Sequence, residues 1–135
     1  MSGRSGLSCV ALSLALSLMT QPAGAASLEL VGYSGHLGEW ELTATVTEDS
    51  SATPKSFSGP LSMKHVGLCT QDGPEEKSGN IRVQMLASSP RMEATLLMDG
   101  VECRYRGMLS DFYDGTMSCH GRETVPLKLW IKETR

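Results

Sequence analysis

The chain has 135 residues, of which 40% are hydrophobic, 20% charged and 5% aromatic. This length accommodates one domain, and this composition excludes a disordered charged tail and a fibrous repeat. The formal net charge is -3. Because no broad basic field exists, we expect no nucleic-acid partner.

The first 25 residues contain the parts of a secretory signal peptide. Arg4 supplies a positive start, Leu7–Met19 form an uncharged apolar run, and Ala23-Gly24-Ala25 match an A-x-A cleavage site. The apolar run is shorter than the roughly 20 residues that span a bilayer, although a retained membrane helix is the alternative. We therefore expect removal of 1–25, a single domain over 26–135, no membrane span in the mature chain, and a secreted or periplasmic location.

The mature chain alternates apolar and polar residues, which is typical of half-buried strands. Polar segments rich in Ser, Pro, Gly, Asp and Glu separate the strands and are expected to be loops, among them 48–54 and 70–80. Pro60 lacks an amide proton, so it predicts a bulge or an interrupted ladder in its strand. The expected strands are Leu28–Tyr33, Trp40–Val46, Phe57–Lys64, Ile81–Met85, Met92–Met98, Val101–Gly107, Tyr113–Cys119 and Val125–Lys132.

The clearest local signal is Asp99-Gly100, which lies between two alternating runs. It predicts a two-residue type I′ hairpin, because both turn positions require a positive φ. That turn places Leu96 opposite Cys103 on the inner face and Glu93 opposite Arg106 on the outer face. The next hairpin is expected to place Cys103 opposite Cys119.

These patterns predict an all-β domain. Seven to eight antiparallel strands joined in sequence hide their apolar faces and their edges when they close into an up-and-down β-barrel. A two-sheet sandwich is the alternative.

Gly38-Glu39-Trp40 opens the first long strand after a turn-like segment, Ser34-Gly35-His36-Leu37. Gly-x-Trp at this place resembles the calycin barrels, which include lipocalins, avidins and small periplasmic protease inhibitors. The resemblance implies that Trp40 plugs one end of the barrel and that a basic residue from near the last strand, Lys128, Lys132 or Arg135, packs across it. Ordinary burial of Trp40 in the core is the alternative.

Three cysteines remain after the cleavage site, namely Cys69, Cys103 and Cys119, and the up-and-down topology gathers them at the Trp40 end. We place the pair Cys103–Cys119 slightly ahead of the pairs that use Cys69, although those would close longer loops. His36, His65 and His120 show no metal-ligand spacing, so we expect no metal site. No motif indicates catalysis or a cofactor.

Aromatic and methionine side chains are expected at the other end of the barrel, where they would line an open mouth for a small apolar ligand. These residues are Phe57, Met85, Met92, Tyr105 and Tyr113. A filled core is the alternative interpretation of the inward-facing methionines.

Two functions follow from these features. The first is a non-catalytic binding protein for an unknown small apolar ligand. The second is a periplasmic inhibitor or protein–protein interaction module that binds an envelope protein through its loops or through a free N-terminal segment, Ala26–Gly35.

Overall fold

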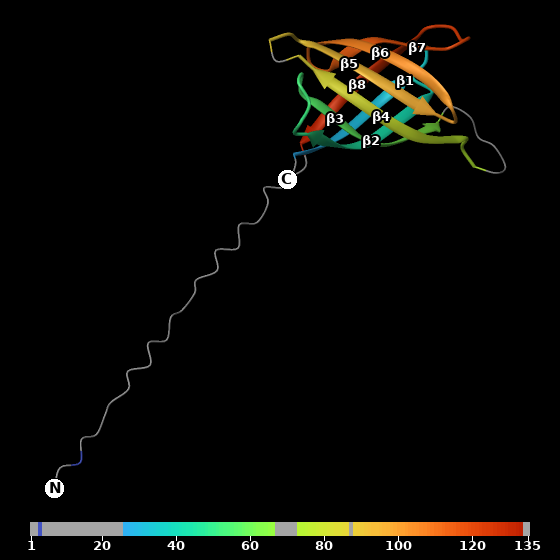
Figure 1. Cartoon of the computed structure of the whole chain (residues 1–135). Helices are drawn as coiled ribbons and strands as arrows, with labels where there is room; N and C mark the ends of the chain where they lie inside the picture. The colour runs from blue at the N-terminus through green and yellow to red at the C-terminus, as the bar shows by residue number, and fades with distance from the viewer. Residues whose placement is uncertain (1–2, 4–25, 67–72, 87, 134–135) are drawn as a thin grey trace.

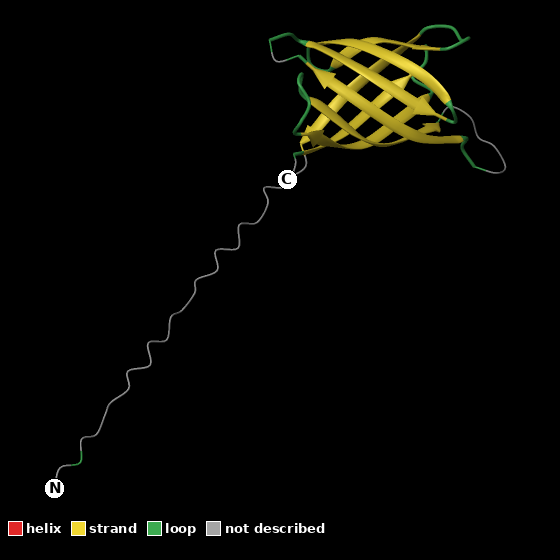
Figure 2. Ribbon diagram, in the orientation of Figure 1, coloured by secondary structure: helices red, strands yellow, loops and turns green. Residues whose placement is uncertain are grey.

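A computed structural model of the chain describes residues 3, 26–66, 73–86 and 88–133. Eight antiparallel strands follow one another along the chain and close into a barrel (Figures 1 and 2). Each strand pairs with the next one, and β1 pairs with β8. The strands are β1 (Ser27–Ser34), β2 (Trp40–Asp49), β3 (Ser56–His65), β4 (Glu76–Met85), β5 (Arg91–Met98), β6 (Val101–Leu109), β7 (Tyr113–Cys119) and β8 (Val125–Glu133).

This architecture confirms the all-β up-and-down barrel, and the two-sheet sandwich is wrong. Closure gives every strand two hydrogen-bonded neighbours, so no edge remains exposed. The expected signal peptide, apart from Gly3, lies outside the described residues, and so does Cys69. In the described part of the chain, no helix has the length and hydropathy that crossing a bilayer requires.

The β5–β6 hairpin has the predicted turn and register. Asp99 and Gly100 both have positive φ, 48° and 77°. Leu96 pairs with Cys103, and Glu93 pairs with Arg106. The Arg106 Nε atom lies 3.4 Å from the Glu93 Oε1 atom on the outer face, which is the cross-strand ion pair that the predicted register places there.

Pro60 interrupts the ladder between β2 and β3, as predicted. Ala44 pairs with Leu61, and the pairing then resumes at Thr47 and Ser58 in the same register. Because the register does not shift, the strand contains an interruption and no bulge.

β4 is longer than its sequence suggested. The polar segment 76–80 was expected to belong to a loop, but it pairs with β3 through contacts such as Lys64 with Glu76. Gly79 lies so close to β5 that a Cβ atom there would collide with the Leu97 carbonyl oxygen. The neighbouring strands therefore determine the conformation of this segment, which has little strand propensity of its own.

The inward-facing side chains of all the strands form a single core. The most buried apolar members are 0–1% exposed and come from β1, β2, β4, β5, β6 and β8. The connections β1–β2, β3–β4, β5–β6 and β7–β8 lie at one end, which we call the Trp40 end. The other end, which we call the Tyr113 end, holds the remaining connections, the start of β1 and the end of β8 (Figure 1).

Candidate functional site

A pocket of about 410 Å³ opens at the Trp40 end of the barrel. Its wall contains residues from most of the strands and from the loops at this end. The lining residues are Ser34, Gly35, Glu39, Trp40, Met63, Lys77, Met98, Asp99, Val101, Cys103, Met117, Cys119, Arg122, Glu123 and Val125.

The floor of the pocket is apolar and rich in sulfur. Met63, Met98 and Met117 are 4%, 7% and 5% exposed, and they belong to β3, β5 and β7. Cys103 and Cys119 form a disulfide in the same wall. Because methionine side chains are flexible and polarisable, such a floor adapts to apolar ligands of irregular shape.

Trp40 is half-buried and forms part of the wall. Its ring meets the His65 ring edge to face, with centroids 4.7 Å apart. The Lys77 ammonium lies 4.8 Å from the centroid of the Trp40 ring. A basic residue thus packs across the tryptophan, but it comes from β4 and not from near the last strand.

The expectation for Lys128 is wrong. Its ammonium lies 5.5 Å from the Phe112 ring, on the outside of the barrel. Lys132 faces solvent, and Arg135 lies outside the described residues. The cause is topological, because Lys128 and Lys132 occupy outward positions of β8, whereas Lys77 is the second residue of β4 and lies in the pocket wall beside Trp40.

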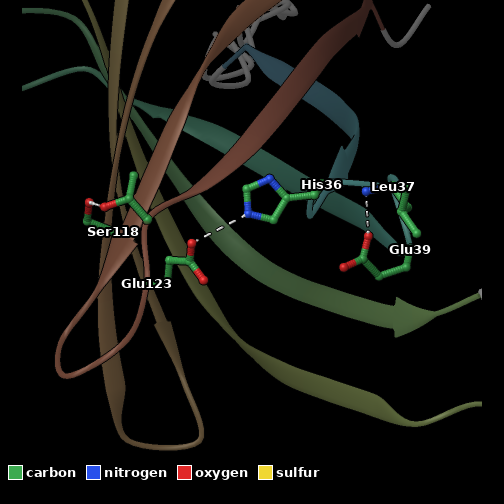
Figure 3. Close-up of polar contacts among 6 residues, drawn as sticks. His36, Leu37, Glu39, Ser118 and Glu123 are labelled. Carbon is green, nitrogen blue, oxygen red and sulfur yellow. Dashed lines mark hydrogen bonds and ion pairs between the residues drawn. The ribbon is translucent and has the colours of Figure 1, made fainter.

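Charged residues of two loops form part of the rim (Figure 3). The Leu37 backbone N–H donates a hydrogen bond to Glu39 Oε2 at 3.0 Å. Backbone N–H groups of Glu39 itself and of Leu37 lower the pKa of the Glu39 carboxyl. In the same β1–β2 loop, His36 Nε2 lies 3.9 Å from Glu123 Oε1, so this loop reaches the β7–β8 loop.

The five residues expected to line a mouth at the Tyr113 end do come together there. Phe57, Met92 and Tyr105 are only 2%, 0% and 2% exposed. The Tyr105 hydroxyl donates to the Tyr113 carbonyl oxygen at 3.2 Å, and the Tyr113 hydroxyl contacts Met85 Sδ at 3.8 Å. Because Phe57, Met92 and Tyr105 are almost fully buried, a ligand at the Tyr113 end would reach them only after side chains of this end had moved.

The sequence therefore indicated which residues face inward, but this pocket lies at the Trp40 end, opposite the end at which we expected the mouth. The signal for Met63, Met98 and Met117 was present, because all three occupy inward positions of the alternation. The sequence does not show how much of the barrel interior the larger side chains fill at each end. Three aromatic rings pack in or against the core near the Tyr113 end, those of Phe57, Tyr105 and Tyr113, whereas Trp40 lies in the wall of the pocket at the other end.

Cys103 and Cys119 form the disulfide that we placed first among the possible pairs. They are directly opposite each other in the β6–β7 ladder. Among the described residues, no three His, Cys, Asp or Glu side chains gather closely enough to hold a metal ion.

The barrel has the architecture that the resemblance to calycins implies, namely eight antiparallel strands in sequential order around a closed sheet. Comparison of the chain with protein-family models and with curated proteins finds no match.

Proposed function

We propose that this protein is an exported, non-catalytic binding protein that takes a small apolar ligand into the pocket at the Trp40 end. One observation carries the proposal, namely the open pocket of about 410 Å³ above a floor of three methionines and a disulfide. Ligand sites in proteins are commonly concave, largely apolar and about 300–1,000 Å³ in volume, with a few polar groups that orient the ligand. Here Glu39, Lys77 and Arg122 of the rim supply such groups.

Export is supported by two independent features. The segment 1–25 has the pattern of a cleaved signal peptide. The disulfide between Cys103 and Cys119 is of a kind that persists in oxidising compartments such as the periplasm.

A titration with N-phenyl-1-naphthylamine, a neutral fluorescent apolar probe, tests the proposal. The Trp130→Phe background leaves Trp40 as the only tryptophan, since the chain has two. We expect a saturable increase in probe fluorescence and energy transfer from Trp40 to the probe. Absence of a saturable signal would contradict the proposal.

A matched pair of variants locates the probe. Val101→Phe adds volume inside the pocket wall, whereas Leu97→Phe adds the same aromatic ring on the outer face of the adjacent strand, where Leu97 is 48% exposed. We expect Val101→Phe to weaken binding about tenfold or more and Leu97→Phe to leave it unchanged. Equal effects would show that the probe binds elsewhere.

A loop-mediated interaction with another protein is the second candidate. The observation in its favour is the exposure of apolar side chains on two adjacent loops at the Trp40 end, with Leu37 92% and Val66 48% exposed. The Val66 N–H donates to the Glu39 carbonyl oxygen at 2.7 Å, which holds the two loops together. Leu37→Ser should then abolish capture of an envelope protein without changing the affinity for the probe.

The version of this candidate that uses a free N-terminal segment is wrong. Residues 27–34 form β1, which pairs with β2 on one side and with β8 on the other. A segment with both edges hydrogen-bonded inside a closed barrel is not available to enter the active site of another protein.

A further inference from the structure

A second hollow, of about 440 Å³, lies on the outside of the barrel over β4, β5, β6 and β7. It is separate from the pocket at the Trp40 end, since the two share no lining residue. Its lining is mainly polar and includes three arginines, Arg82, Arg104 and Arg106.

The strand register explains how the hollow forms. One row across the sheet contains Arg82, Thr95, Arg104 and Ser118, in that order. The small Thr95 side chain lies between Arg82 and Arg104, and the small Ser118 side chain lies on the other side of Arg104. Both leave space above the sheet. The Cα atoms of Arg82 and Arg104 are about 10 Å apart, because neighbouring strands are spaced by about 4.8 Å.

The arginines keep donor groups available. Arg104 Nε contacts Glu102 Oε1 at 3.3 Å, and Arg106 Nε contacts Glu93 Oε1 at 3.4 Å. These ion pairs use one nitrogen of each guanidinium, and the two side chains are 81% and 71% exposed. Since a guanidinium carries five N–H donors in a planar fork, each of them is able to bind a further carboxylate.

The charge of the hollow is opposite in sign to that of the whole molecule. Four of the five arginines that the structure describes lie on the outer face of β4–β6, and Glu76, Glu93 and Glu102 lie on the same face. The lining of the hollow itself contains three arginines and one carboxylate, Glu93, whereas the whole chain has a net charge of -3. A local field opposite in sign to the net charge favours a partner with negative charge at this face.

The hollow also contains features that distinguish among anionic partners. Glu93 projects into it beside Arg106. A polymer with a negative charge at every unit would place one of its charges next to the Glu93 carboxylate, which would repel it. A peptide whose acidic residues are separated by uncharged ones is able to place an uncharged residue there. Gln84, Thr95 and Thr116 supply side-chain hydrogen-bonding groups for the amides of such a peptide.

We propose that this hollow, which we call the arginine groove, binds an extended acidic peptide segment of another protein through Arg82, Arg104 and Arg106. Alternate residues of an extended chain point to the same side about 6.8 Å apart. Arg104 and Arg106 are themselves alternate residues of β6. Carboxylates at alternate positions of the peptide therefore match the spacing of these two arginines.

The test is fluorescence anisotropy with a labelled peptide of alternating Asp and Ser, against the same peptide with Asn in place of Asp. We expect saturable binding of the Asp peptide, weakening with added salt, and none of the Asn peptide. Arg104→Gln and Arg106→Gln should each weaken binding about three- to tenfold, and the triple variant with Arg82→Gln should abolish it.

Two variants make the test specific. Arg91→Gln removes the same charge from the same outer face but outside the groove, and it should leave the affinity within about twofold. Glu93→Gln removes the competing carboxylate and should tighten binding. All variants should unfold at the wild-type urea midpoint, because the substituted side chains project outward.

Three results would overturn the proposal. The first is an equal loss of affinity in Arg91→Gln and Arg104→Gln, which would show a diffuse charge effect. The second is unchanged binding in the triple variant. The third is tighter binding of a single-stranded oligonucleotide than of the Asp peptide at equal charge, which would assign the groove to a uniformly anionic polymer.

Discussion

Cys103 and Cys119 face each other across β6 and β7, with their Cα atoms 4.0 Å apart and their sulfur atoms bonded. The disulfide closes a loop with a sequence separation of 16 and stands in the wall of the Trp40-end pocket. A single covalent link therefore connects the stability of the barrel with the shape of its pocket.

We expect replacement of both cysteines by alanine to lower the free energy of unfolding by about 3 kcal/mol, the chain-entropy value for a loop of this size. Urea unfolding of the double variant measures the loss, and wild-type protein unfolded in the presence of dithiothreitol is the control for the lost covalent link. A change below about 1 kcal/mol would show that the disulfide contributes little to stability.

Gly115→Ala should destabilise the barrel by about 1–3 kcal/mol, the usual cost of overpacking. Gly115 pairs with Gly107, and a Cβ atom at position 115 would collide with the Arg106 carbonyl oxygen and lie 2.6 Å from the Gly107 Cα atom. Since these are backbone atoms, the strand itself has to shift. The neighbouring Thr116→Ala, on an exposed position of the same strand, is the control and should change stability far less.

Tyr105→Phe should change how stability depends on pH. Burial, together with Asp114 and Tyr113, raises the pKa of the Tyr105 hydroxyl above the ordinary tyrosine value of about 10. In wild-type protein, Tyr105 of the unfolded chain ionises at a lower pH than Tyr105 of the folded chain. The stability that the neutral, buried Tyr105 contributes is therefore complete below about pH 10 and is lost as the pH rises above it. The phenylalanine variant lacks the contribution.

Urea midpoints of both proteins at about pH 7 and about pH 10.5 test this expectation. Near neutral pH the variant should be less stable by about 1 kcal/mol, because the hydrogen bond to the Tyr113 carbonyl oxygen is lost. At the higher pH the difference should shrink. A difference that is constant, or that grows with pH, would contradict the assigned direction of the pKa shift.

Lys77→Gln should remove the cation from the face of Trp40 and cost about 0.5–1 kcal/mol. In the Trp130→Phe background, it should also change the emission of Trp40. Lys64→Gln is the matched control, because it removes the same charge from an exposed residue of β3 that lies beside the start of β4. Equal effects of the two substitutions would show that net charge, and not the contact with the ring, is responsible.

The strand order and much of the register follow from short-range patterns in the sequence. Asp99-Gly100 sets the β5–β6 pairing because its two positive φ angles are local requirements. The alternation along β2 and β8 indicates which side chains face inward, because the period of a strand is two residues and does not depend on the rest of the fold.

The start of β4 was missed for the opposite reason. Its residues Glu76–Asn80 are polar and include a glycine, and nothing local in them favours an extended conformation. They become a strand because β3 offers hydrogen-bonding partners along this length. Segments of this kind are decided by their neighbours in space.

The sequence by itself determined the succession of antiparallel strands, their inward-facing residues and the β5–β6 register, since each depends on local periodicity or on a turn. It favoured the closed barrel over a sandwich and the pair Cys103–Cys119 over pairs with Cys69, and the tertiary structure decided both. Only the tertiary structure decided which end of the barrel holds the pocket and that Arg82, Arg104 and Arg106 surround one hollow. Both depend on the volumes of side chains from several strands, and that sum is fixed only when the strands are brought together.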